Sequence, residues 1–342
     1  MLRVRVDGRV QRWNGAEPTE SIRVGRHQIS AHILARPAVR LIWQGGTTVF
    51  RRVIVATDLS PSSYAVVKCL GGLRAYGVKR CLLLLCLSVQ EVTSTALSDT
   101  SAYIDSTLRE QKDILQQTGY SVETRVVQGF VWRELNRIAA EEDYSLIVIG
   151  SRGRSMVGEA FLGGVAYDVI HHACRPVLLV RLKVTPSGGH ECVRVDRCDF
   201  GEHVLFPTDF SETADQAFTY VATLVAAGAK RVTLLHVQDQ AHFDPHLLYR
   251  LAEFNEIDRD RLERMKEVLQ RQGKADIGIE LCYGSPFTEI NRVVRVREVH
   301  LVVMGSQGRG FVKELFLGSV SHNVARHSDA AVLLIPAKRE EG

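Results

Sequence analysis

The chain has 342 residues, of which 45% are hydrophobic and 24% are charged, and its formal net charge at pH 7 is +4. The length favours about two domains, and the composition is that of a globular protein. Basic and acidic residues are interspersed, which excludes the concentrated positive charge of a nucleic-acid-binding protein. We therefore expect no nucleic-acid partner.

Apolar runs are short throughout the chain. The longest, Cys81 to Val89, has the length of a strand and falls well below the ~20 residues that a membrane-spanning helix needs. The N-terminal sequence "MLRVRVDGRV" lacks the apolar core of a secretory signal. We expect no membrane association and a cytoplasmic location.

Seven cysteines are scattered along the sequence, at positions 69, 81, 86, 174, 192, 198 and 282. An odd number without regular spacing favours reduced thiols over a disulfide framework. Cys192 and Cys198, with His190 and His203 nearby, suggest a metal site as the alternative, but their spacing matches no common zinc pattern. We expect free thiols and no bound metal.

In chain order, the first segment is an N-terminal extension, residues 1–49, whose role the sequence does not indicate. Its short alternations, such as "LRVRV" and "HILARPAVRLIW", favour a small sheet or a cover for a sheet edge. This segment matches neither of the two repeated regions that follow it.

The rest of the sequence contains one domain twice. "VIVATDLS" at 53–60 returns as "VLFPTDFS" at 204–211, "LIVIGSRGRS" at 146–155 as "LVVMGSQGRG" at 301–310, and "FLGG" at 161–164 as "FLGS" at 316–319. Blocks that recur in the same order at such a long period indicate a duplicated domain. We call residues 50–182 copy one and residues 202–337 copy two; a linker, 183–201, joins them, and a tail, 338–342, follows.

Short apolar runs alternate with helical patterns in each copy. In copy two the runs cover residues 204–206, 232–237, 277–282, 301–304 and 331–335, and the helical patterns cover 212–227, 248–271, 287–296 and 319–327. Runs of Val, Ile and Leu without alternation are typical of strands buried on both faces of a parallel sheet. The fold class we predict is α/β, with two tandem doubly wound domains, each on a five-stranded parallel sheet.

Glycines recur between the fourth strand and the last helix of each copy. They are Gly305, Gly308 and Gly318 in copy two, and Gly150, Gly153 and Gly163 in copy one. Ligands bind at the carboxyl ends of parallel strands, and glycines at a helix N-terminus let a phosphate approach backbone N–H groups. The alternative is that the glycines are turn residues and that Ser319 is an N-cap. Repetition of the whole pattern favours a phosphate site.

An aspartate follows the first strand of each copy, Asp58 in copy one and Asp209 in copy two. Its carboxylate can accept hydrogen bonds from a sugar hydroxyl or an exocyclic amine. Ser60 and Ser211 lie two residues further on and are suited to cap the next helix. We expect the serine to cap the helix while the aspartate faces a ligand.

The pattern G-x2-G-x9-G-[ST], formed by Gly305, Gly308, Gly318 and Ser319, together with "TD-x-S" after the first strand, resembles the universal stress protein family of the ATP-binding type. The resemblance extends over both copies in order. It implies a tandem universal stress protein with the adenine nucleotide alpha hydrolase-like fold. Because members of that family pair through their last strand, it also implies pairing of residues 177–180 with 332–335 in the same chain, with a homodimer as a further form.

The resemblance further implies where a nucleotide binds. In copy two, adenine and ribose would be contacted by Pro207, Thr208, Asp209 and Val237, and ribose and phosphates by Gly305, Gly308, Arg309, Gly318, Ser319, Val320 and Ser321; Met304 belongs to the same nucleotide-binding set. The corresponding set in copy one is Ala56, Thr57, Asp58, Gly150, Gly153, Arg154, Gly163 and Gly164. Gly164 and Ala166 stand there in place of Ser319 and Ser321, so we expect ATP, with or without Mg²⁺, mainly in copy two.

These observations favour an ATP-binding protein that acts as a nucleotide-dependent regulatory or binding module in stress response. The sequence contains no arrangement of nucleophile, base and orienting group, so no catalytic residue is assigned and at most slow ATP hydrolysis is expected. Two alternatives remain open at this point. One is a slow ATPase or autophosphorylating protein, with Ser319 or Ser321 as phosphoacceptor, and the other is a nucleotide-free interaction scaffold. Protein partners are not identified by the sequence.

Overall fold

The computed structural model describes residues 3–6, 9–12, 22–24, 27–29, 50–88, 98–152, 162–187, 190–195, 197–239, 251–308 and 317–337. The chain divides into two compact units, residues 1–44 and 45–342. The first unit contains two small antiparallel pairs, β1 (Arg3–Val6) with β2 (Arg9–Arg12), and β3 (Ile22–Val24) with β4 (His27–Ile29). The expectation of a small sheet is thereby confirmed at "LRVRV", while the stretch "HILARPAVRLIW" lies outside the described residues.

Copy one alternates strands and helices along its length. Its elements are β5 (Arg52–Thr57), α1 (Pro61–Cys69), the 3₁₀ helix η2 (Leu70–Tyr76), β6 (Arg80–Leu87), α3 (Ser98–Gln117), β7 (Ser121–Gln128), α4 (Val131–Glu141), β8 (Leu146–Gly150), α5 (Gly164–His172) and β9 (Val177–Val180). The linker that follows contains an antiparallel hairpin, β10 (Lys183–Ser187) with β11 (His190–Arg194), which sequence reasoning missed.

Copy two repeats this order with a longer first helix. They are β12 (Val204–Pro207), α6 (Glu212–Ala226), β13 (Arg231–Asp239), α7 (Leu251–Gln270), β14 (Asp276–Gly284), α8 (Pro286–Val296), β15 (Leu301–Gly305), α9 (Ser319–His327) and β16 (Ala331–Ile335). Each predicted strand and helix of copy two is present, with bounds that differ by a few residues at most.

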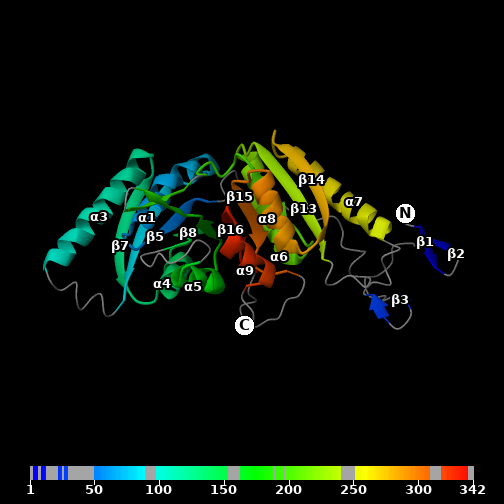
Figure 1. Ribbon diagram of the computed structural model, residues 1–342, viewed down its shortest axis with the longest axis horizontal. Coiled ribbons are helices and arrows are strands. Elements are labelled where there is room, and N and C mark those ends of the chain that lie inside the picture. Colours follow the sequence, from blue (N-terminus) through cyan, green and yellow to red (C-terminus); the bar gives the residue numbers. More distant parts are fainter. Residues whose placement is uncertain are drawn as a thin grey trace. The chain divides into compact units, whose positions relative to one another are not determined.

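One ten-stranded sheet runs through both copies, in the order β14-β13-β12-β15-β16-β9-β8-β5-β6-β7 (Figure 1). Within each copy the five strands are parallel, and the first strand lies at the centre of the order. The copies join where β16 pairs with β9 antiparallel, with Val332 opposite Leu179 and Leu334 opposite Val177. Pairing of the two copies through their last strands is therefore confirmed.

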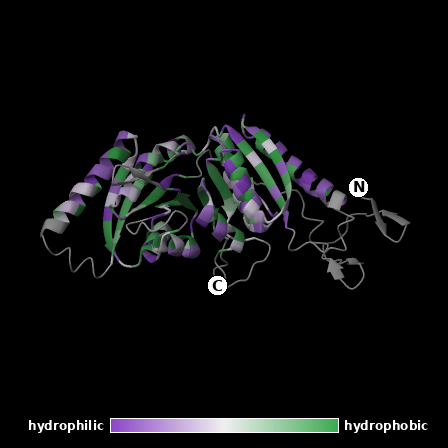
Figure 2. Cartoon of the chain, in the orientation of Figure 1, coloured by the Kyte–Doolittle hydropathy of each residue, from purple (hydrophilic) through white to green (hydrophobic). Residues whose placement is uncertain are grey.

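The helices cover the sheet in two groups. In copy two α6 packs with α7, and α8 packs with α9, and the same holds for α1 with α3 and α4 with α5 in copy one. The inner strands of each copy are buried along most of their length, which explains their unbroken Val, Ile and Leu runs, whereas the edge strands β7 and β14 are mostly half-buried or exposed. Figure 2 shows this as green strands beneath helices banded with purple, α3 and α7 most clearly. Both copies thus have the predicted doubly wound arrangement.

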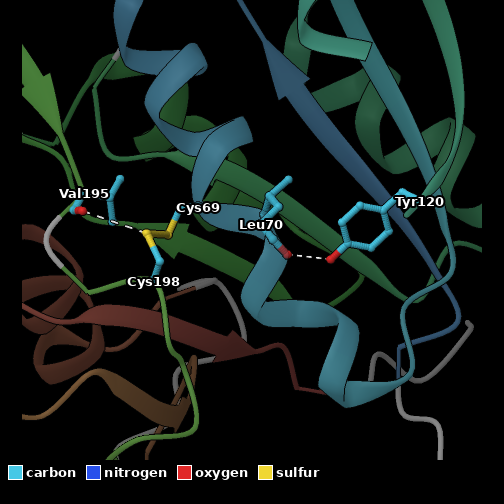
Figure 3. Close-up of a disulfide and its surroundings, with 5 residues drawn as sticks. All are labelled: Cys69, Leu70, Tyr120, Val195 and Cys198. Atoms are coloured by element: carbon cyan, nitrogen blue, oxygen red, sulfur yellow. Dashed lines mark hydrogen bonds between the residues drawn. A yellow bond between two sulfur atoms is a disulfide. The ribbon is translucent and has the colours of Figure 1, made fainter. Parts of the chain in front are cut away.

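The segment that leads into each copy contacts the first helix of the other copy. Phe50, which precedes β5, is buried and stacks on Tyr220 of α6 with ring centroids 5.8 Å apart. Cys198, in the linker before β12, forms a disulfide with Cys69 at the end of α1 (Figure 3). Their Cα atoms are 4.9 Å apart, within the range that a disulfide spans. The expectation of free thiols is therefore wrong for these two cysteines.

Candidate functional site

The turn after β12 orients the aspartate of copy two. The Thr208 hydroxyl accepts a hydrogen bond from the Phe210 N–H at 3.0 Å, and Asp209 Oδ1 accepts one from the Ser211 N–H at 3.0 Å. Phe210 has a φ of 58°, an uncommon backbone conformation for a bulky residue that these bonds hold in place. The Ser211 hydroxyl then caps α6 by accepting from Ala214 N–H at 3.2 Å.

Copy one contains the same turn after β5. The Thr57 hydroxyl accepts from the Leu59 N–H at 3.1 Å, Asp58 Oδ1 accepts from the Ser60 N–H at 3.1 Å, and Leu59 has a φ of 62°. The Ser60 hydroxyl accepts from the Ser63 N–H at 3.4 Å and caps α1. Capping by the serine of each copy is confirmed.

Two glycines of copy two, Gly308 and Gly318, lie close together beside Asp209. Gly305 ends β15, and Gly318 is the N-cap of α9, with its N–H donating to the Ser306 carbonyl at 2.7 Å. A Cβ built on Gly318 would lie 3.6 Å from Gly308 N, and one built on Gly308 would lie 2.6 Å from Asp209 Oδ2. Only a glycine at 308 therefore leaves the Asp209 carboxylate where it is, and the carboxyl ends of β12 and β15 meet at this point.

The two serines after Gly318 have different surroundings. Ser319 is exposed and is the first helical residue of α9, so the alternative that it is the N-cap is wrong. Ser321 is buried, and its hydroxyl donates to the Gly305 carbonyl at 2.8 Å. Because a hydroxyl has one hydrogen to donate, Ser321 as placed connects α9 to the end of β15 and does not offer that hydrogen to a ligand.

An apolar group lies on the α8 and α9 face of the same sheet. Met304 is buried in the core cluster of this face, and Val237 and Val320 pack against that cluster while remaining partly exposed. Pro207 and Thr208, at the end of the neighbouring strand β12, are buried. The structure therefore places apolar side chains, a carboxylate and a glycine-lined backbone at one end of copy two.

The corresponding residues of copy one keep the backbone pattern but not the side chains. Gly163 caps α5, and its N–H donates to the Ser151 carbonyl at 3.0 Å, as Gly318 does to Ser306. Gly164 has open space where a Cβ would be, and Ala166 is buried in the place of Ser321. Ala56 is partly buried, and Gly150 ends β8. Gly153, Arg154 and Arg309 lie outside the described residues.

Sequence reasoning missed one feature beside the copy-two site. His236 of β13 is buried against the Thr208 carbonyl, with Nδ1 at 2.7 Å, and its Nε2 lies 3.5 Å from Asp258 Oδ2 of α7. The signal was present in the repeat, because copy one has Leu85 where copy two has His236. A polar residue in place of a buried apolar one is informative, since burial of an unpaired polar group is unfavourable.

The cysteine and histidine residues considered as a metal site have other contacts. Cys198 is in the disulfide, and both ring nitrogens of His203 are 2.9 Å from protein oxygens, those of the Arg297 carbonyl and the Thr233 hydroxyl. The side chains of His190 and Cys192 lie outside the described residues. Over the part of the chain that is described, no three His, Cys, Asp or Glu side chains gather as metal ligands, and no helix is long and apolar enough to cross a bilayer.

Comparison with known proteins gives the class to which this fold and site belong. The profile of the Universal stress protein family matches residues 50–181 and again residues 201–336. The chain therefore belongs to the universal stress protein family, as a tandem member.

Individual relatives agree with this assignment. Universal stress protein MJ0577 of Methanocaldococcus jannaschii is 32% identical over 153 residues, which cover 40% of this chain and 94% of the relative. A universal stress protein of Mycolicibacterium smegmatis is 26% identical over 225 residues, covering 65% of this chain and 72% of the relative. The crystal structure of a universal stress protein from Archaeoglobus fulgidus has a TM-score of 0.60 at 23% identity and covers 86% of this chain and 99% of its own. That likeness shows the tandem fold.

Proposed function

We propose that copy two binds an adenine nucleotide such as ATP and that the protein acts as a nucleotide-dependent binding module. The observation that carries this proposal is the convergence of Asp209, Gly308 and Gly318 at the carboxyl ends of β12 and β15. A carboxylate suits the ribose hydroxyls, and the helix N-terminus of α9, with its glycines, suits the phosphates. The apolar group of Val237, Met304 and Val320 would contact the adenine ring.

Gly308→Ala tests this site directly. The new Cβ would lie 2.6 Å from Asp209 Oδ2 and would displace that carboxylate, while the backbone at Gly308 needs no unusual φ. Loss of a hydrogen bond to a charged group lowers affinity roughly tenfold to hundredfold. Titration calorimetry with ATP and Mg²⁺ should therefore show this loss in the full-length protein.

Gly278→Ala is the matched control. Gly278 lies in β14 of the same copy, and a Cβ there would have no neighbour within 4 Å. ATP affinity should be unchanged in this variant. Equal affinities of the wild type and the Gly308→Ala protein, both folded, would refute the site.

Binding rather than turnover is the role that the site supports. If the protein is a binding module, it should retain ATP and release phosphate far below the ~1–10³ s⁻¹ of typical enzymes. Phosphate release in that range, with Mg²⁺ present and abolished by Gly308→Ala, would make the protein an ATPase instead.

A further inference from the structure

Four side chains that copy one lacks form a cluster at the turn that carries Asp209. They are His236 of β13, Phe210 of the turn itself, and Asp258 and Arg261 of α7. The rings of Phe210 and His236 have centroids 4.6 Å apart, and the Arg261 guanidinium carbon lies 5.1 Å from the Phe210 centroid. Arg261 is also 3.4 Å from Asp258 Oδ1, so the four side chains form a closed ring of contacts.

Both nitrogens of His236 face oxygen acceptors. Nδ1 lies 2.7 Å from the Thr208 carbonyl, and Nε2 lies 3.5 Å from Asp258 Oδ2. A neutral imidazole has one N–H, so it can donate to only one of these oxygens and would turn a lone pair toward the other. Only the protonated ring donates at both nitrogens. The geometry therefore favours the imidazolium form of His236.

Asp258 supplies the countercharge for that form. Its side chain is 14% exposed, and Oδ2 also accepts a hydrogen bond from Gln238 Nε2 at 3.0 Å. Burial alone would raise the pKa of Asp258, but the interactions with His236, Gln238 and Arg261 hold that pKa below its usual value. The carboxylate is thus kept ionised next to the ring.

Among the described residues, Asp258 is the anion of α7 that lies beside the His236 ring. Arg261 faces Asp258 and Phe210, Asp209 follows the Thr208 residue that the ring contacts, and β14 places Leu281 beside His236 in register. In copy one the residue equivalent to His236 is Leu85, which is buried. The Thr57 hydroxyl, equivalent to that of Thr208, donates a hydrogen bond to Gln111 at 2.8 Å. An imidazole at this position is therefore particular to copy two.

The contact with Thr208 reaches the site through one peptide bond. The carbonyl that His236 contacts belongs to the same planar peptide unit as the N and Cα of Asp209. Holding this carbonyl fixes the plane from which the Asp209 side chain projects toward Gly308. A loss of the hydrogen bond at His236 would release that plane, together with the Phe210 ring, which packs against His236 in a tilted arrangement.

We propose that His236, held by Asp258, is a positioning residue for the copy-two site and couples nucleotide binding to protonation of its ring. This inference rests on the proposed function of that site. The protonated ring fixes the Thr208–Phe210 turn in the form that presents Asp209. Binding is therefore strongest where the ring is protonated and weakens as the pH rises and the ring loses its proton.

The test is titration calorimetry of the full-length protein with ATP and Mg²⁺ between pH 6.0 and 8.5. His236→Leu, which introduces the residue of copy one, supplies the baseline, because it retains the titration of ATP itself. At the acidic end we expect His236→Leu to bind roughly tenfold more weakly than the wild type, because it lacks one charge-assisted hydrogen bond. At the alkaline end this difference should be smaller, because the neutral ring of the wild type offers the Thr208 carbonyl only an uncharged donor. Titrations in two buffers of different ionisation enthalpy should show extra proton uptake in the wild type only.

Two further variants separate positioning from folding. His236→Gln keeps a neutral donor for the Thr208 carbonyl, so it should retain more affinity than His236→Leu but lose the extra pH dependence. His203→Gln is the control, since His203 is another buried histidine of copy two whose Nε2 faces a hydroxyl, which can itself donate. It should keep the wild-type pH profile.

The outcomes distinguish this inference from the proposed function. No ATP binding by the wild type at any pH would overturn both. ATP binding with the same pH dependence in the wild type, His236→Leu and His236→Gln proteins would overturn the role of His236 alone. An unfolded His236→Leu protein leaves the decision to His236→Gln, whose unchanged pH profile would equally contradict the proposal.

Discussion

Copy one and copy two contain the same salt bridge with its charges exchanged. In copy one Arg125 of β7 lies 2.5 Å from Glu142, and in copy two Glu280 of β14 lies 2.7 Å from Arg297 at the equivalent positions. An equivalent residue at the start of each copy contacts the backbone of one member of this pair. Arg52, the first residue of β5, donates to the Glu142 carbonyl at 2.6 Å, and His203, which precedes β12, has Nδ1 2.9 Å from the Arg297 carbonyl.

The exchange teaches which differences between the copies alter the fold and which alter a site. The same geometry accommodates either polarity of the salt bridge. These two positions therefore require opposite charges, but not a particular charge at each one. Next to the turns that carry Asp58 and Asp209, the two copies differ in polarity. Copy one has the apolar residue Leu85 where copy two has His236 with its charged partner Asp258. The first difference preserves local structure, and the second changes what can be held at the carboxyl ends of the strands.

The largest expected difference between the copies is covalent. Cys69 of α1 is bonded to Cys198 across 129 residues of sequence, whereas the equivalent position of α6 is Tyr220, which stacks on Phe50. Closing a loop of this size stabilises the folded state by about 4–5 kcal/mol in the chain-entropy treatment. Cys69→Ala with Cys198→Ala should lower the free energy of unfolding by several kcal/mol, measured by denaturant titration without reductant.

Thiol counting checks the same bond independently. Cys174 is exposed and should be alkylated in the native protein, while burial raises the pKa of Cys81 and of Cys86 to about 12 and slows their reaction. Cys69 and Cys198 should be alkylated only after reduction. Cys174→Ala, the matched control, should leave the unfolding midpoint unchanged. If dithiothreitol left the unfolding midpoint of the wild type unchanged, the disulfide would not stabilise the protein, and this difference between the copies would not exist.

Arg181 forms hydrogen bonds across the junction from copy one, and copy two has no equivalent arginine. It follows β9 of copy one and donates to the Ala325 and Arg326 carbonyls at the end of α9, at 3.1 and 3.2 Å, while the equivalent residue of copy two is Pro336. Burial lowers the pKa of Arg181 to about 10, so the guanidinium remains charged at neutral pH. Arg181→Met should destabilise the protein by about 2–3 kcal/mol, because two hydrogen bonds from a charged group are lost.

Arg175→Met is the comparison variant. Arg175 lies 3.7 Å from Asp143, whose side chain is 95% exposed, and such surface pairs contribute about 0–1 kcal/mol. Denaturant midpoints should therefore fall clearly for Arg181→Met and little for Arg175→Met. Similar shifts in the two variants would show that the capping of α9 across the junction is not what stabilises it.

Restoring the missing hydroxyls of copy one should make the two sites more alike. Gly164→Ser has open space for its side chain, and Ala166→Ser would place a hydroxyl where Ser321 donates to the backbone of copy two. We expect the double variant, made in a Gly308→Ala background that weakens binding by copy two, to bind ATP about tenfold more tightly than that background alone. Calorimetry that finds no gain would assign the weakness of copy one to its apolar surroundings instead of these hydroxyls.

The smallest expected effect concerns the exchanged salt bridge. Arg125→Glu should destabilise copy one by about 1 kcal/mol, since the pair is partly exposed and the change adds a second carboxylate beside Glu142. The triple variant Arg52→His, Arg125→Glu, Glu142→Arg transplants the copy-two arrangement and should recover most of the loss in a denaturant titration. A triple variant less stable than Arg125→Glu would show that the two polarities are not interchangeable.

The pH dependence of this effect has a definite sign. The hydrogen bond from Arg125 holds the pKa of Glu142 below its usual value, and the contacts of Glu280 with Arg292 and Arg297 outweigh burial to do the same for Glu280. A depressed carboxyl pKa contributes stability at neutral pH that disappears as the carboxylate is protonated in acid. The cost of Arg125→Glu should therefore shrink in unfolding experiments below pH 4.

Much of the fold follows from the sequence because the pattern of each strand and helix occurs in both copies. The run at 331–335 is predicted as a strand with the bounds that β16 has, and α7 was predicted at 248–271 and lies at Leu251–Gln270. The 3₁₀ helix Leu70–Tyr76 was not predicted, because its glycines suggest a turn. A Cβ at Gly72 would overlap the Cys198 carbonyl, so that glycine is explained by a long-range contact that no local pattern contains.

The candidate site divides in the same way. The aspartate turn and the glycine spacing follow from local rules for strand ends and helix starts, and these predicted how Ser60 and Ser211 are used. The disulfide could not be deduced, because an odd number of cysteines allows many pairings and Cys69 is far from Cys198 in sequence. The role of the Ser321 hydroxyl depends on which acceptor is near, and only the coordinates place the Gly305 carbonyl there.

The antiparallel contact of β9 with β16 has a consequence for stoichiometry. Partners joined by one polypeptide meet at an effective concentration in the millimolar range for short linkers, so dilution does not separate them. If the two domains were separate subunits made from one gene, the dimer would contain two identical sites. If one gene copy carried a mutation, mutant and unchanged subunits would pair at random. A fused pair is fixed at one to one with unlike members, which allows the two sites to respond to different ligands or different acidity within a single molecule.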